Sequence, residues 1–205
     1  MAQVQLDIPY NDGPRNRGTV AIRILLAIPH LVIVSVWNYA VEIVAVIHWF
    51  IQVFTVKRNE GLFNFSNRYL GYASRTYTYV GLLFDEYPGF IDDAGKTPVQ
   101  YSFEYTESVD RLTAGLRLIW AIPALLISAG LSIAVLFVTI VTWFTILITG
   151  KHPRGQFDFQ LKVHRYSIQT NAYVGLLTDD YPKFAEPPDT RPVGMNSFDP
   201  ATPTP

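Results

Sequence analysis

The 205-residue chain contains no cysteine, which excludes disulfide bonds, thiolate metal sites and cysteine nucleophiles but leaves the redox compartment open. Its net charge is −1, so it lacks the positive field with which proteins hold nucleic acid. The N-terminus has no basic stretch followed by an apolar one, and we expect no cleavable signal peptide. Phosphate loops, nucleophile elbows, zinc spacings and kinase signatures are also missing, so we expect no enzyme activity.

Charge is missing altogether from residues 118–150, the most apolar stretch of a chain that is 49% hydrophobic. One straight helix over this stretch would be about 50 Å long, whereas the hydrocarbon core of a bilayer is about 30 Å thick. We therefore predict a transmembrane helical hairpin over 112–149 that bends near residues 128–132. A matching hairpin is predicted over 19–56, with its bend near residues 36–39.

Most of the sequence consists of one unit used twice, with the second copy 94 residues after the first. A check for such repeats comes before other assignments, because a repeat decides the architecture. The matching segments are 23–29 with 117–123, 49–50 with 143–144, 57–65 with 151–159, and 79–90 with 173–184. So many identities at one register indicate a tandem duplication.

Each unit also contains two amphipathic segments. Apolar and polar residues alternate over 4–10 and 99–106, which predicts a short β-strand before each hairpin, and we expect the two strands to pair. After each hairpin, aromatic residues recur at helical spacing and predict amphipathic helices over 64–83 and 158–177. These helices lie either in the lipid headgroup layer or on the strands, as part of a small cytoplasmic core.

Together these patterns predict an all-α integral membrane protein built from two tandem repeats. The first repeat spans residues 1–94 and the second 95–184, and each contains a strand, a transmembrane hairpin and an interfacial amphipathic helix. Residues 185–205 are rich in proline and predict an extended tail.

Basic residues stand on both sides of each apolar run, as the predicted hairpins require. The hairpins bring all of them to one membrane surface, and the positive-inside rule makes that surface cytoplasmic. Arg23 and Arg117 lie just inside the runs, from where they can extend to the surface. The predicted membrane-interface residues are Arg23, Arg117, Lys57, Lys151, Tyr72 and Tyr166.

Three ionisable residues interrupt the first apolar run, namely His30, Glu42 and His48. In a hairpin the two histidines would lie at similar depth, where they could bind a porphyrin metal or relay protons with Glu42. The favoured alternative is that they join the two arms of the hairpin by hydrogen bonds or lie at the membrane interface. The second unit has no ionisable residue at these positions, so the fold does not require them. We expect no cofactor and no metal ion.

The repeated strings resemble those of a known family. They are R-x-x-x-A-I-P, W-F, G-K-x-P-R-G-x-F-D-F and Y-x-x-L-L-x-D-x-Y-P-x-F, and they resemble the bacterial membrane family known as domain of unknown function 4389. The resemblance covers residues 4–184 in two copies, and the first copy departs from it at residues 56–60. It implies an integral membrane protein and no particular activity.

The sequence favours a non-catalytic structural or accessory subunit of a larger bacterial membrane complex, such as a respiratory or photosynthetic assembly. Its expected partners are the lipid bilayer and other membrane subunits, but not nucleic acid. We expect it in the bacterial inner membrane as a multi-pass protein with both termini cytoplasmic. The alternative is a small transporter or lipid-handling protein, because many transporters contain duplicated units.

Overall fold

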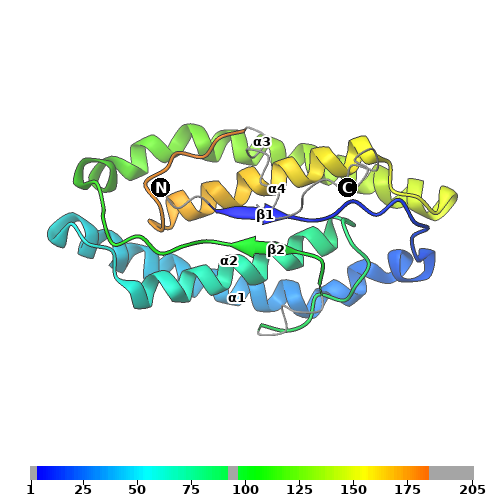
Figure 1. The fold of residues 1–205 in the computed structure, drawn as a ribbon, viewed down its shortest axis with the longest axis horizontal. Helices are drawn as coiled ribbons and strands as arrows, with labels where there is room; N and C mark the ends of the chain where they lie inside the picture. The colour runs from blue at the N-terminus through cyan, green and yellow to red at the C-terminus, as the bar shows by residue number, and fades with distance from the viewer. Residues whose placement is uncertain (1–3, 92–96, 185–205) are drawn as a thin grey trace, which may run out of the picture.

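The computed structural model describes residues 4–91 and 97–184 of the chain. Its elements are β1 Gln5–Asp7, α1 Arg17–Thr55, α2 Glu60–Val80, β2 Gln100–Ser102, α3 Arg111–Thr149 and α4 Arg154–Val174. The chain thus consists of two long and two shorter helices with one small sheet (Figure 1). The expected tail at 185–205 and the expected boundary after residue 94 lie outside the described residues.

Each apolar run forms one continuous helix, so the predicted hairpins over 19–56 and 112–149 are wrong. Both α1 and α3 contain 39 residues, and the positions expected to bend lie near the middle of each. The serines there do not break the helix, because their hydroxyl groups bond to carbonyls one turn earlier. Ser35 Oγ donates to Leu31 O at 2.7 Å, and Ser132 Oγ donates to Ser128 O at 2.8 Å.

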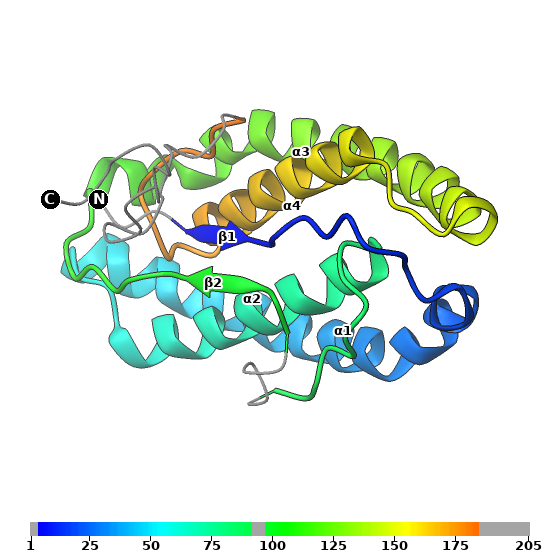
Figure 2. The same ribbon diagram turned by 45° about the vertical axis from the view of Figure 1, so that its right-hand side comes forward.

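Both long helices are arched rather than straight (Figure 2). Pro29 and Pro123 lie inside α1 and α3, where each removes a backbone hydrogen bond and its ring pushes against the preceding turn. The two prolines occupy equivalent positions of the two units, so both helices carry the same source of curvature.

In each unit the shorter helix folds back along the longer one, so that α2 packs on α1 and α4 packs on α3. The predicted strands are present, and they pair antiparallel with Leu6 opposite Tyr101. The units exchange these strands: β1 of the first unit contacts α4, whereas β2 of the second contacts α2. The two units are therefore interlocked in one structure.

The long helices run antiparallel and contact each other at both ends through a reciprocal pair of hydrogen bonds. Trp49 Nε1 donates to Ala114 O at 3.0 Å, and Trp143 Nε1 donates to Val20 O at 3.0 Å. These four residues are equivalent in pairs between the units, so the contact has the form of a two-fold symmetric dimer within one chain.

The molecule is layered along its shortest axis (Figure 1). In this view β1 and β2 lie in front of the shorter helices α2 and α4, and the long helices flank and back them. The main core joins the shorter helices to the strands and to the inner side of α1. Its largest buried members include Phe63, Tyr72, Tyr79 and Phe157.

The two long helices begin and end in the same way. Asn16 and Asp110, at equivalent positions, accept backbone hydrogen bonds as the N-caps of α1 and α3. Both helices end at a residue in the left-handed conformation, which is Gly150 in the second unit and Val56 in the first. A β-branched side chain is strained in this conformation, whereas glycine adopts it freely.

This difference predicts stability changes of opposite sign. Gly150→Val should lower the free energy of unfolding by about 2 kcal/mol, because it adds left-handed strain. The new Cβ would also lie 3.1 Å from Arg17 Nη2. Val56→Gly should raise stability by up to about 1 kcal/mol, since it removes that strain. Thermal unfolding of the detergent-solubilised variants measures both, and equal changes in the two variants would contradict the assignment.

Candidate functional site

The interior of the first unit contains a buried arginine that joins α1 to the segment after α2. Arg23 is 1% exposed, and its Nη2 lies 2.7 Å from Asp85 Oδ1. Its Nη1 donates to Phe84 O at 2.6 Å, and the guanidinium lies 4.6 Å from the ring centre of Tyr79. The charge is thus neutralised by the carboxylate and covered by the aromatic ring.

The second unit repeats this cluster. Arg117 Nη2 lies 2.5 Å from Asp179 Oδ1, and its Nη1 donates to Thr178 O and to Tyr173 O. The Tyr173 ring centre lies 4.2 Å from the guanidinium carbon. The two units thus share the same arginine, carboxylate and tyrosine at equivalent positions.

Each carboxylate also faces a second arginine, but the two arginines come from different places. Arg15, just before α1, approaches Asp85 Oδ2 at 3.5 Å. Arg58, just after α1, approaches Asp179 Oδ2 at 3.5 Å and therefore links the two units. Burial lowers the pKa of Arg58, and the Asp179 carboxylate opposes that shift. The sequence shows both arginines as flanking basic residues and gives no sign that they are buried.

The membrane-interface position predicted for two of the residues is therefore wrong. Arg23 and Arg117 do not extend to a membrane surface, because each is buried and held by its aspartate and by backbone carbonyls. Lys57 and Lys151 follow the C-terminal ends of α1 and α3 and are exposed, and Lys57 forms an exposed ion pair with Glu107. Their contact with lipid headgroups stays a prediction.

The predicted interface tyrosines are also buried. Tyr72 is 1% exposed and Tyr166 is 3% exposed, and both lie on the inward side of their helices. Of the two arrangements that the aromatic stripe allowed, the structure has the helix packed against the strands. The predicted contact of Tyr72 and Tyr166 with headgroups is wrong, because their rings contact protein: Tyr72 lies beside His30 and Trp37 of α1, and Tyr166 lies beside Phe184.

The two candidate histidines lie far apart. His30 and His48 are 18 residues apart in one helix, which separates them by about 27 Å along its axis. His30 Nδ1 lies 2.7 Å from Tyr72 Oη, and its ring stacks on Phe90. His48 Nε2 accepts a bond from the backbone N–H of Asn59. The expectation that a hairpin brings the two histidines side by side is wrong, because this separation is too large for one porphyrin metal or one direct proton relay to join them.

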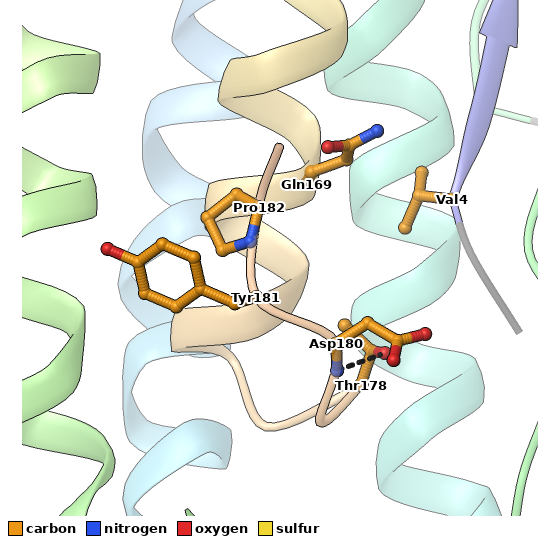
Figure 3. A pocket seen from close by; sticks show the side chains of 6 residues that line it. All are labelled: Val4, Gln169, Thr178, Asp180, Tyr181 and Pro182. Carbon is orange, nitrogen blue, oxygen red and sulfur yellow. Dashed lines mark hydrogen bonds between the residues drawn. The ribbon is translucent and has the colours of Figure 1, made fainter. Parts of the chain in front are cut away.

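Among the described residues, no group of three His, Asp or Glu side chains is placed to hold a metal ion. Glu42 is exposed near the middle of α1 and accepts a hydrogen bond from Asn38 Nδ2 at 2.6 Å. Figure 3 shows a small hollow lined by Val4, Gln169, Thr178, Asp180, Tyr181 and Pro182. Its free volume is about 10 Å³, the room of one water molecule.

A histidine that the sequence analysis did not single out joins the units. Burial, together with the nearby charge of Arg15, lowers the pKa of His152 to about 4. Its Nδ1 lies 3.2 Å from Leu82 O, so the neutral ring carries the proton on Nδ1 and donates it to this carbonyl. Arg58 is the equivalent residue of the first unit, and its Nε donates to the equivalent carbonyl of Leu176 at 3.0 Å.

The shifted pKa of His152 predicts a loss of stability on acidification. Between pH 6.5 and 4 the unfolded chain binds a proton at this histidine and the folded chain does not, so stability falls as pH falls. The loss should approach about 3 kcal/mol by pH 4 and then level off. Unfolding of His152→Asn should depend less steeply on pH in this window. An unchanged slope would show that His152 is not buried as a neutral ring.

The outward sides of the long helices form the largest unusual surface. We call the exposed apolar side chains of α1 and α3 the outer apolar face. Its strongly exposed members include Leu25, Val36 and Phe54 in α1 and Leu118, Leu126 and Ile148 in α3. Both helices are long and apolar enough to cross a membrane. Soluble monomers do not expose apolar surface over such lengths, so this face indicates contact with lipid or with another protein.

Comparisons with known proteins identify one family. The model of a family described as "Domain of unknown function (DUF4389)" matches residues 17–92 and again residues 111–186. The double match confirms the tandem duplication. No curated protein matches the chain, and no solved structure matches it.

Proposed function

Since this chain belongs to the family described as "Domain of unknown function (DUF4389)", we propose a function from the chain's own surfaces and interior. We propose that it is a non-catalytic structural or accessory subunit of a larger membrane protein complex. It resides in the cytoplasmic membrane of a bacterium, is held there by α1 and α3, and has both ends of the chain on the cytoplasmic side.

The outer apolar face is the observation that carries this proposal. It runs along both long helices, and lipid acyl chains can cover it without any further partner. Val4 and Pro182 line the same small hollow, so the described ends of the chain lie together (Figure 3). This placement agrees with both ends of the chain lying on the same side of the membrane.

The ion pairs of the buried arginines support a structural role. The four buried arginines of the two clusters are bound to two aspartates and to backbone carbonyls, which leaves these groups no freedom to bind a substrate. Exposed polar groups on the strands, among them Asp7 and Gln100, give the molecule a polar side that another subunit can contact. A rigid, interlocked body with one apolar and one polar side suits a protein that holds others in place.

The proposal is tested by gentle purification of the chain from its native membrane. We expect it to elute with one or more other membrane proteins in a fixed ratio that persists over two independent columns. A homogeneous preparation of the chain alone, at any detergent strength that preserves its fold, would contradict the accessory role.

The alternative function is a small transporter or lipid-handling protein, and reconstitution distinguishes it. Vesicles containing the purified chain should show no more flux of protons or small ions than empty vesicles. Glu42→Gln serves as the control, because Glu42 is the exposed carboxyl group within α1. Flux that requires Glu42 would overturn the accessory-subunit proposal in favour of transport.

A further inference from the structure

We propose that the molecule lies with its long axis in the plane of the membrane and immerses only its outer apolar face in one leaflet. Neither α1 nor α3 then crosses the bilayer. This inference rests on the proposed membrane residence and specifies how the protein meets the lipid. The outer apolar face is covered by lipid acyl chains beneath an anionic headgroup layer.

The length of the outer apolar face is the first argument. In α1 it extends from Ile22 to Phe54, which is about 50 Å along the helix, and α3 carries apolar exposed side chains over a similar length. The hydrocarbon core measures about 30 Å. A helix across the membrane would therefore leave about 20 Å of apolar side chains in water, whereas a helix in the plane covers all of them.

The strand layer gives the second and stronger argument. β1 and β2 run along the long axis near its middle (Figure 1), and their flanks expose Asp7, Gln100 and Glu104. If the long axis crossed the membrane, these charged and amide groups would lie at the depth of the acyl chains. Exposed strand edges and carboxylates do not occur in contact with hydrocarbon. With the axis in the plane, this layer faces water.

The distribution of exposed charge is the third argument. Exposed basic residues stand at the ends of the long helices, beside the outer apolar face; they are Arg17, Lys57, Arg111 and Lys151. On and directly beside the strands, the exposed charged residues Asp7 and Glu104 are acidic. Glu107 instead pairs with Lys57 just after α1. Basic groups around an immersed apolar face attract anionic headgroups, as in helices that lie at an interface. The acidic layer is then directed away from the lipid.

One exposed charge lies within the apolar length of α1. Glu42 is on the flank of the helix, and its carboxylate is bonded by Asn38, which in turn accepts from Tyr69 Oη at 2.8 Å. Shallow immersion of about 5–10 Å lets this polar chain stay near the headgroups. A crossing helix would place Glu42 near the centre of the bilayer instead, where a charge is most costly.

The orientation is tested by measuring depth along α1 in the full chain, which has no native cysteine. Nitroxide labels are attached to Leu25→Cys, Val36→Cys and Phe54→Cys, in vesicles of three parts phosphatidylethanolamine to one part phosphatidylglycerol. Oxygen and a nickel chelate then report the depth of each label. Ser102→Cys on the strand layer serves as the control and should be exposed to water.

We expect the three α1 labels to lie at similar depth, within about 5 Å of one another, below the headgroups of one leaflet. A crossing helix would instead place Val36 more than about 15 Å deeper than Phe54, and that result would overturn the orientation while leaving membrane residence intact. Labels that are accessible to the nickel chelate at all three positions would show that the face does not contact lipid, and would overturn the proposed function itself.

Discussion

Replacement of Asp179 by asparagine should lower the free energy of unfolding by about 3 kcal/mol. The substitution removes the carboxylate that faces both Arg117 and Arg58, and it leaves these two guanidiniums buried without a counter-charge. Loss of one partner of a buried ion pair costs about 3–5 kcal/mol. We expect the lower end of that range, because the Asp179 side chain itself is about a quarter exposed.

The neighbouring Asp180→Asn is the matched control for this substitution. Asp180 has the same chemistry and lies next in the chain, but its carboxylate has no ion pair among the described residues. It should change stability by less than about 0.5 kcal/mol. Unfolding in mixed micelles with increasing denaturing detergent measures both variants. Equal effects of the two substitutions would show that the ion-pair cluster does not hold the second unit together.

Trp143→Ala should be similarly destabilising, by about 3 kcal/mol, and should loosen the contact between the two units. Its ring packs beside Val20, Leu82 and Ile146, and its indole N–H donates to Val20 O across the units. Replacement of a packed tryptophan by alanine leaves a cavity and removes the hydrogen bond that joins the units. Hydrogen exchange should therefore rise at the start of α1 as well as at the end of α3.

Trp120→Ala in the same helix provides the comparison, since Trp120 is exposed on the outer apolar face. Its removal should leave the stability of the fold within about 0.5 kcal/mol of the original. If exchange at the start of α1 rose equally in both variants, the reciprocal tryptophan contact would not be what joins the units.

Much of the fold could be predicted because the same information stands twice in the sequence. The duplication, the two strands and the amphipathic helices all follow from periodicity, and the structure contains each of them. The buried ion pairs also left a trace that the sequence analysis missed. Arg23 with Asp85 and Arg117 with Asp179 keep the same separation of 62 residues. When an arginine one turn inside an apolar run and a later aspartate recur at the same spacing in both repeats, the two residues are expected to form an ion pair.

The predicted hairpins are wrong because they assume that each apolar helix crosses the bilayer and so cannot be longer than its hydrocarbon core is thick. Residues 128–132 form no bend, because the Ser132 hydroxyl bonds within the helix and a Cβ at Gly130 would meet no neighbouring atom. The burial of Tyr72 could not be predicted either, because an aromatic stripe suits lipid headgroups and a protein core equally well.

Extraction of membranes with alkaline carbonate tests directly whether lipid covers the outer apolar face. We expect the chain to remain with the sedimented membranes after the wash and to be released only by detergent. A variant with Leu25, Val36, Leu126 and Phe137 all replaced by glutamate should be released by the wash. Recovery of the unaltered chain as a monodisperse monomer in buffer without detergent would contradict the claim.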